Sequence, residues 1–157
     1  MERHIVLVSP DVHWNTGNIG RTCLGTDSVL HLIKPLGFSL DDKHLKRAGL
    51  DYWKNVEIFL WDDFEIFLKN TNPKKEELVF FSKLGKKIYT KMPRLERLFL
   101  VFGSETKGLS SEITEKFKDN LYYIPVNKKI RSLNLSTSAG IALYESLRSE
   151  SDFHEWK

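Results

Sequence analysis

The sequence predicts an α/β fold in which a mostly parallel sheet is flanked by helices. Two patterns lead to this prediction: short apolar runs rich in β-branched and aromatic residues recur along the chain, and helical patterns separate them. A continuous apolar run, as opposed to an alternating one, is typical of a strand that is covered on both faces. Strands that alternate with helices then favour a layered α/β architecture.

Six apolar runs are expected to form the strands. They are IVLV (5–8), VLHLI (29–33), VEIFLW (56–61), LVFFS (78–82), LFLVF (98–102) and LYYIP (121–125). Pro125 ends the last run, because proline has no N–H to donate to a neighbouring strand.

Four segments are expected to be helical: residues 18–27, 62–70, 110–119 and 134–150. Asp62 or Asp63 is expected to cap the second helix, and a pair of serines opens the third. The last helix carries one stripe made of Leu135, Ala139, Ala142, Leu143, Ser146 and Leu147. The small residues at 138–142 would also let another helix approach closely.

The composition indicates one globular domain, residues 1–157, with no internal repeat and no linker. The net charge of +3 is compatible with an RNA partner without establishing one. Cys23 is the only cysteine, so no intramolecular disulfide can form, and the Cys/His spacing of a zinc site is absent, so no metal is expected. The apolar runs are too short for a signal peptide or a membrane span, and we expect a soluble cytoplasmic protein.

The stretch VFGSETKGLSS (101–111) raises the first functional question. Gly103 and Gly108 follow an apolar run and have the spacing of the first half of a phosphate-binding P-loop. A P-loop needs lysine after the second glycine, where this chain has Leu109, and Glu105 would repel phosphate. A nucleotide hydrolase is therefore disfavoured. Glu105 instead predicts a partner that offers donors or positive charge, unless the turn is a plain connection with a solvated glutamate.

Two further stretches offer similar choices. In WNTGNIGR (14–21), residues 15–18 predict a turn and Arg21 is expected on the first turn of the helix that follows. This stretch either offers amides and a cation to an RNA backbone or is a capped helix with a surface arginine. In IPVNKKIRSLNLSTSAG (124–140), a basic loop leads to Ser132 and Asn134. These two residues either hold an adenosyl or carboxylate group or only cap the last helix.

Together, NTGNIGR, FGSETKGL and IPVNKKIRSLNLS resemble, in order and spacing, the three signature motifs of the SPOUT superfamily of S-adenosylmethionine-dependent RNA methyltransferases. The segment LHLIKPLGFSLDDKHLKRAGLDYW (30–53) is similar to one branch of that superfamily. This branch consists of the small single-domain tRNA (cytidine/uridine) 2′-O-methyltransferases, which act on the wobble nucleotide. The resemblance covers residues 4–149. Where the family commonly has a Pro-Pro pair this chain has His13 and Trp14, a change that removes none of the polar motif residues.

The resemblance implies a fold, an assembly and a donor pocket. It implies an α/β domain whose carboxyl-terminal part forms a deep trefoil knot, and a homodimer with the last helix in its interface. It also implies that S-adenosylmethionine is bound by the knot loops. By motif position, the residues that would line this pocket are Phe81, Gly103, Ile124, Ser132 and Leu133.

The resemblance also assigns the chemistry. The reaction would be displacement of methyl from a sulfonium by a ribose 2′-hydroxyl, with Arg21 as the motif arginine nearest that hydroxyl. Because a guanidinium does not normally deprotonate, Arg21 is expected to bind phosphate and stabilise the developing alkoxide, and its role as a base stays an alternative. Asn15 would position Arg21 or the nucleotide. Glu105 would pair with an arginine or a motif amide, and Asn134 and Ser132 would complete the polar wall.

The RNA partner, the anticodon stem-loop of a tRNA, is expected to meet a basic surface. The candidates are Lys43, His44, Lys46, Arg47, Lys128, Lys129 and Arg131, with Tyr52 and Trp53 stacking on an unpaired base. Two alternatives stay open: a ribosomal RNA ribose methyltransferase, which shares the three motifs, and a non-catalytic RNA-binding module on the same scaffold.

Overall fold

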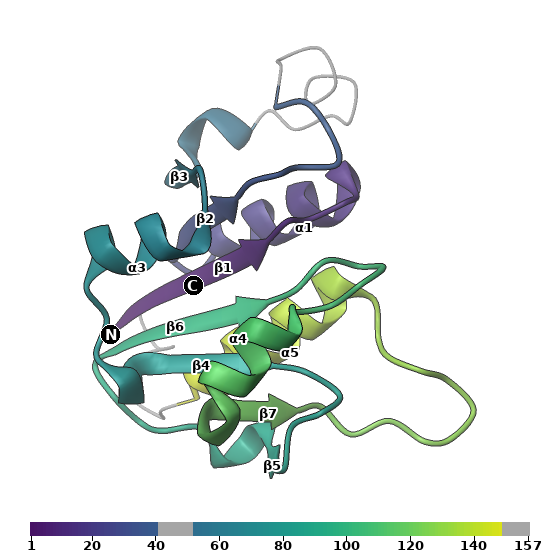
Figure 1. The fold of residues 1–157 in the computed structure, drawn as a ribbon. Helices are drawn as coiled ribbons and strands as arrows, with labels where there is room; N and C mark the ends of the chain where they lie inside the picture. Colours follow the sequence, from purple (N-terminus) through teal and green to yellow (C-terminus); the bar gives the residue numbers. More distant parts are fainter. Residues whose placement is uncertain (41–51, 149–157) are drawn as a thin grey trace.

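A computed structural model describes residues 1–40 and 52–148 as one seven-stranded sheet with helices on both faces (Figure 1). The strands are β1 (Glu2–Val8), β2 (Val29–Ile33), β3 (Ile58–Trp61), β4 (Leu78–Phe81), β5 (Lys87–Ile88), β6 (Arg97–Phe102) and β7 (Leu121–Tyr123). Their order in the sheet is β3-β2-β1-β6-β4-β7-β5, and every pairing between these strands is parallel.

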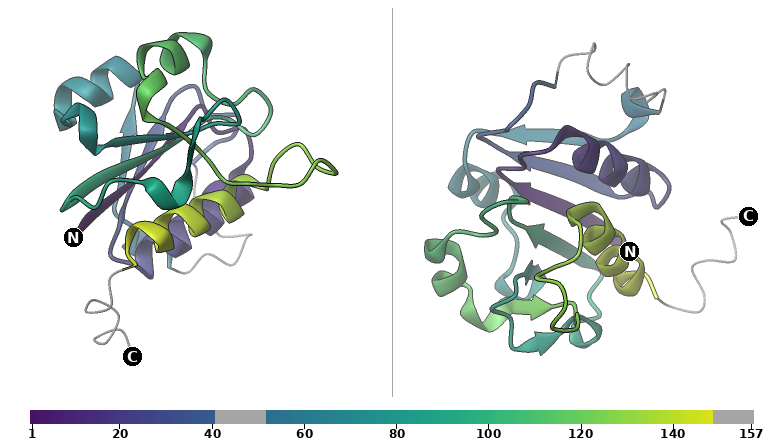
Figure 2. Two further views of the ribbon diagram at one scale, coloured as in Figure 1. Left: turned by 90° about the horizontal axis from the view of Figure 1, so that it is seen from below. Right: turned by 90° about the vertical axis from the view of Figure 1, so that its right-hand side faces the viewer.

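The helices are α1 (His13–Leu24), α3 (Phe64–Thr71), α4 (Ser111–Lys116) and α5 (Leu135–Ser146). Short 3₁₀ turns occupy Trp53–Asn55, Lys75–Glu77, Tyr89–Lys91 and Lys118–Asn120. Figure 2 shows α1 and α5 side by side on one face of the sheet, with α3 and α4 on the other face.

Side chains that alternate along β1 explain why both faces need a helical layer. Ile5 and Leu7 are buried in one cluster with Ile19 of α1 and Ala142 of α5. Val6, between them, is buried in a second cluster that includes residues of α3 and α4, such as Phe67 and Ile113. Because successive strand residues point to opposite faces, both faces of β1 need apolar residues, which produces the continuous run.

The predicted α/β class and mostly parallel sheet are confirmed, and in the described residues all strand pairings are parallel. Asp63 caps α3 by accepting from the Ile66 N–H at 2.7 Å, and Ser110 caps α4 by accepting from the Ile113 N–H at 3.3 Å. The two-residue strand β5 carries too short a pattern to be predicted. The helix expected over 110–119 ends at Lys116, because Phe117 leaves helical geometry and a 3₁₀ turn follows.

One predicted boundary is wrong in a way that matters for function. Residues 15–18 were expected to form a turn, but α1 begins at His13 and includes them. The reversal of the chain takes place earlier, at Ser9, which has a positive φ of 50°. No side chain nearby in sequence caps α1, and the amides that precede it are satisfied from another loop, which local sequence cannot reveal.

Candidate active site

The three sequence motifs meet at one edge of the sheet. The segments that follow β1, β6 and β7 all leave from the carboxyl ends of parallel strands, where open α/β sheets bind ligands. In Figure 1 these segments are the turn into α1, the turn from β6 to α4, and the long excursion from β7 to α5. The sheet thus gathers stretches that lie more than a hundred residues apart, such as Asn15 and Asn134.

Glu105 is the centre of this edge. Its carboxylate accepts from the Asp11 N–H at 2.7 Å, the Val12 N–H at 3.2 Å and the Asn15 Nδ2 at 3.1 Å. The expectation that Glu105 pairs with a motif amide is confirmed, and the alternative of a solvated glutamate is wrong. A carboxylate suits this place because backbone N–H groups at the start of a helix need acceptors.

Asn15 and Asn134 extend the contact to the third motif. The Nδ2 of Asn134 donates to the Oδ1 of Asn15 at 3.0 Å, so Asn15 uses its oxygen toward Asn134 and its NH₂ toward Glu105. Asn134 also caps α5, because its Oδ1 accepts from the Ser136 N–H at 2.8 Å. The capping interpretation of Asn134 is therefore confirmed, and its expected role in the polar wall of an active site stays a prediction. We call Glu105, Asn15 and Asn134 the polar triad.

Asp11 and Thr106 add a second connection between the same loops, which the sequence did not reveal. The Thr106 Oγ1 donates to the Asp11 Oδ2 at 2.6 Å, and the Thr106 N–H donates to the same oxygen at 3.2 Å. Hydrogen bonding from Thr106 lowers the pKa of Asp11, which keeps its carboxylate ionised. In the sequence, only the polar character of Asp11 and Thr106 could have indicated this contact.

The residues expected to line the donor pocket follow three neighbouring strands. Phe81 at the end of β4 is paired with Phe102 of β6 and with Tyr122 of β7. Gly103 and Ile124 therefore follow the ends of the two strands next to β4. The Phe81 ring stacks on Phe102, with centroids 4.7 Å apart. Ser132 and Leu133 lie just before α5, Ser132 exposed and Leu133 half-buried.

Gly103 is fixed by close approach of the chain to itself. A Cβ at this position would lie 2.0 Å from the carbonyl carbon of Gly108, so no side chain can replace its hydrogen without moving the loop. The Gly108 N–H donates to the Ser104 carbonyl at 2.9 Å, and Gly108 adopts a positive φ of 69°. The spacing of Gly103 and Gly108 thus allows the chain to form a tight turn that is closed by a hydrogen bond.

Known proteins resemble most of this chain. Residues 2–144 match the SpoU rRNA Methylase family. The chain belongs to this family. A protein of Listeria innocua, provisionally named a tRNA (cytidine(34)-2′-O)-methyltransferase, is 48% identical to it over 96% of this chain and 90% of its own.

Solved structures of related proteins share the fold. One, described as giving structural insights into the 2-OH methylation of C/U34 on tRNA, has a TM-score of 0.82 at 39% identity and covers 94% of this chain and 95% of its own. An AdoMet-bound rRNA methyltransferase from Sinorhizobium meliloti also has a TM-score of 0.82, but at 23% identity it shows the fold alone; the match covers 94% of this chain and 56% of that one.

In this SpoU-family chain, Arg21 is not a hydrogen-bond partner of the polar triad within residues 1–40 and 52–148. It lies in the last turn of α1, so its expected place on the first turn of a helix is wrong. Its guanidinium carbon is 5.6 Å from the centroid of the Tyr52 ring, and the Tyr52 hydroxyl donates to the Gly17 carbonyl at 3.1 Å. The error follows from the early start of α1, since Arg21 is six residues, more than one and a half turns, beyond Asn15.

Tyr52 and Trp53 were expected to stack on an RNA base, and both pack against α1 in the structure. Trp53 covers Gly20 so closely that a Cβ there would lie 2.5 Å from the indole ring. Both side chains are half-buried. Their contacts with α1 give them a structural role that the sequence did not indicate.

The basic residues divide into two groups. Lys128, Lys129 and Arg131 are exposed on the segment between β7 and α5, which projects from the body of the molecule (Figure 1). Lys43, Lys46 and Arg47, with His44, lie outside the described residues. Within residues 1–40 and 52–148, no helix has the length and apolar character needed to cross a bilayer.

Proposed function

We propose that this chain transfers a methyl group from S-adenosylmethionine to the ribose 2′-hydroxyl of the wobble nucleotide of a tRNA. The observation that carries the proposal is the polar triad, which joins all three motifs by side-chain hydrogen bonds at the ligand-binding edge of the sheet. The relatives that are 40–48% identical to this chain carry the name of that reaction.

Phe81, Gly103, Ile124, Ser132 and Leu133 would hold the methyl donor. The set fits such a group, because half-buried apolar side chains at strand ends provide a slot for adenine and main-chain amides provide hydrogen bonds. It also contains no lysine or arginine that would repel a sulfonium cation. When bound, S-adenosylmethionine supplies an electrophilic methyl group.

The chain's own residues would orient the ribose and manage the proton of its 2′-hydroxyl. The Glu105 carboxylate already accepts three hydrogen bonds, and Asn15 is engaged at both ends, so we assign both to positioning the motif loops. Arg21 is exposed and permanently charged, which suits binding of phosphate and stabilisation of alkoxide charge as the proton leaves. Asn134 holds the amino terminus of α5 against Asn15.

The assembly that we propose is a homodimer in the cytoplasm, formed by single-domain chains with a carboxyl-terminal trefoil knot. Support for the interface comes from α5, where Tyr144 is 50% exposed and a Cβ on Gly140 would meet no atom within 4 Å. Support for the knot is the tight passage of the chain at Gly85, where a Cβ would lie 2.5 Å from the main chain of Tyr122.

We further propose that Lys128, Lys129 and Arg131 contact the RNA backbone, together with Lys43, Lys46 and Arg47. The exposed basic segment between β7 and α5 supports the first group. Electrostatic contacts with phosphates release counterions, so tRNA affinity should fall steeply as salt concentration rises.

The deciding experiment is a methyl-transfer assay with labelled S-adenosylmethionine and total tRNA from a strain that lacks this gene, followed by nucleoside mass spectrometry. A 2′-O-methylated wobble nucleotide is the expected product. If tRNA is not methylated, the same assay is repeated with ribosomal RNA, and transfer there would change the substrate class. Donor binding with no transfer to either RNA would favour a non-catalytic module.

A further inference from the structure

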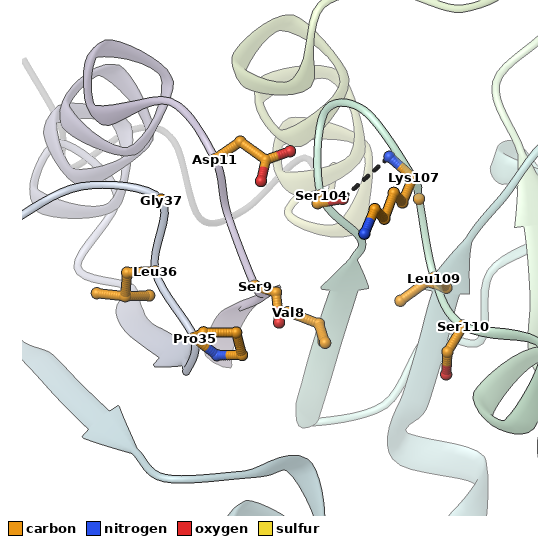
Figure 3. A pocket seen from close by; sticks show the side chains of 11 residues that line it. Val8, Ser9, Asp11, Pro35, Leu36, Gly37, Ser104, Lys107, Leu109 and Ser110 are labelled. Carbon is orange, nitrogen blue, oxygen red and sulfur yellow. Dashed lines mark hydrogen bonds between the residues drawn. The ribbon is translucent and has the colours of Figure 1, made fainter.

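A crevice of about 390 Å³ lies at the carboxyl edge of the sheet (Figure 3). It adjoins the polar triad, because the N–H of Asp11 in its lining donates to Glu105. We call it the switch-point crevice. Its lining residues are Val8, Ser9, Asp11, Pro35, Leu36, Gly37, Ser104, Lys107, Gly108, Leu109 and Ser110. None of them belongs to the set that would hold the methyl donor, so this crevice has no assigned ligand.

The topology explains why a crevice forms here. β1 and β6 are neighbours in the sheet, but the chain leaves β1 for α1 on one face and leaves β6 for α4 on the other. Two connections that turn away in opposite directions leave a gap between the strand ends. In open α/β sheets this switch point is the usual place for a ligand.

The walls of the crevice are held before any ligand binds. The Gly37 N–H donates to the Pro10 carbonyl at 2.9 Å, which fixes the segment after β2 to the segment after β1. The Asp11–Thr106 and Asp11–Glu105 hydrogen bonds fix the segment after β1 to the turn after β6. Ser9 adopts a positive φ of 50°, a conformation that surrounding structure must enforce.

The lining combines apolar side chains with one cation. Pro35 and Leu36 form one side and Leu109 the opposite side, as Figure 3 shows. The Lys107 side chain folds back over the end of β6, and its ammonium makes no hydrogen bond or ion pair within residues 1–40 and 52–148. The one carboxylate of the lining, Asp11, is engaged by Thr106.

We propose that the switch-point crevice binds one nucleotide unit of the RNA substrate, a neighbour of the methylated nucleotide. The base lies between Pro35, Leu36 and Leu109, and its phosphate contacts Lys107. Apolar side chains next to a cation match the packing of an unstacked base between apolar side chains and the charge-assisted contact to its phosphate. The turn at 103–110 carries both Lys107 and Glu105, so a strand bound at the polar triad continues past the crevice.

This inference rests on the proposed function for the source of the nucleotide, since a free nucleotide has the same chemistry. The experiment therefore uses two probes on the full chain: cytidine 5′-monophosphate and an unmodified tRNA anticodon stem-loop. Binding is followed by amide chemical shifts in NMR spectra of ¹⁵N-labelled protein. We expect cytidine 5′-monophosphate to shift Gly37, Lys107 and Gly108 but not Leu133, and the stem-loop to displace it.

Variants of Lys107 test the phosphate contact. Loss of a charge-assisted hydrogen bond predicts that Lys107→Glu weakens both probes about tenfold, with Lys107→Ala intermediate and Lys107→Arg close to wild type. Lys118→Glu is the matched control. Lys118 is exposed, carries the same charge and lies just before β7, at the opposite edge of the sheet.

Each outcome has a definite meaning. Displacement by the stem-loop together with loss in Lys107→Glu supports the inference. A nucleotide that binds at Lys107 but is not displaced by RNA overturns the RNA source, and absence of any shift at Gly37 and Lys107 overturns the site. Methyl transfer to tRNA with an unchanged KM in Lys107→Glu defeats this inference alone, whereas binding in the crevice without any methyl transfer defeats the proposed function alone.

Discussion

Single residues decide how the motif loops meet, and Glu105 is the clearest case. It occupies a glycine-rich turn where a phosphate would be bound in a P-loop, and its carboxylate collects two main-chain amides and the Asn15 side chain. One charged side chain thereby replaces the caps that α1 lacks locally. The same residue therefore links the proposed active site to the stability of the fold.

The Glu105→Gln variant tests this double role. A glutamine amide can accept through one oxygen only, and its NH₂ would face the donors of Asp11 or Asn15. We expect a loss of about 1–3 kcal/mol in unfolding free energy, the cost of leaving half-buried donors unpaired, and a lower methyl-transfer rate. Urea titration measures the first. Glu115→Gln, an exposed substitution on α4, should change neither quantity, and equal effects of the two variants would contradict the assigned role.

Arg21 carries the second prediction at this scale. Arg21→Ala should reduce methyl transfer at least about a hundredfold if its cation stabilises charge at the 2′-hydroxyl. Donor affinity, measured by calorimetry, should stay near the wild-type value, because Arg21 is outside the set proposed for donor binding. Wild-type turnover in this variant would remove Arg21 from the mechanism.

The third prediction at the residue scale concerns a buried pair of histidines. His31 Nε2 lies 2.9 Å from His4 Nδ1, and the Trp61 indole donates to His31 Nδ1 at 3.0 Å. Burial lowers the pKa of His31 to about 3, and burial also lowers the pKa of His4 despite its contact with Glu2.

Below the ordinary histidine pKa of about 6.5, both histidines therefore take up protons in the unfolded chain but stay neutral in the folded chain. The contribution of these histidines to the unfolding free energy should be fully present above about pH 6.5 and should be lost between about pH 6.5 and about pH 3. From His31 alone, we expect a loss of about 1 kcal/mol at pH 5.5. Urea midpoints at pH 7.5 and 5.5 measure the change. His31→Phe should reduce the pH dependence, and an unchanged slope would show that other groups cause it.

At the scale of elements, the turn between β6 and α4 shows how two glycines differ in purpose. Gly103 has no room for a side chain, whereas Gly108 has open space but a backbone conformation that favours glycine. Glycine is therefore required at position 103 because there is no space for a side chain, and it is favoured at position 108 because of the backbone conformation.

This contrast gives a paired prediction. Gly108→Ala should cost only about 1 kcal/mol, the penalty of a left-handed alanine. Gly103→Ala must move the Gly108 backbone, and we expect a loss above about 3 kcal/mol together with weaker donor binding. Thermal unfolding and donor calorimetry of both variants provide the measurement. Similar losses in the two variants would mean that the loop relaxes around Gly103.

At the scale of the whole molecule, α5 packs on the sheet and beside α1 with its apolar stripe, yet Tyr144 and Gly140 are left facing outward. A glycine in a helix interior is normally unfavourable. In an isolated chain Gly140→Ala should therefore stabilise α5, by about 0.5–1 kcal/mol.

The proposed dimer predicts a different result. If a partner helix packs on Gly140, the added methyl group should weaken association by about tenfold, as overpacking of a close contact does. Sedimentation analysis across protein concentrations separates the two cases. Glu115→Ala on α4 serves as a control for helix propensity without an expected interface. Unchanged association would place the interface elsewhere.

Local sequence patterns predicted the α/β class, six of the seven strands, a cap at Asp62 or Asp63 and a serine pair at the start of α4, and the resemblance of the three motifs predicted that Glu105, Asn15 and Asn134 come together. These features can be predicted because each pattern or motif consists of residues that are close together in the sequence. The tertiary structure alone decided that α1 begins at His13, that Arg21 stands on its last turn, and that a crevice opens between β1 and β6. The physical reason is that Glu105 satisfies the amides before α1 from more than ninety residues away, and the direction of each connection depends on which face of the sheet its helix covers.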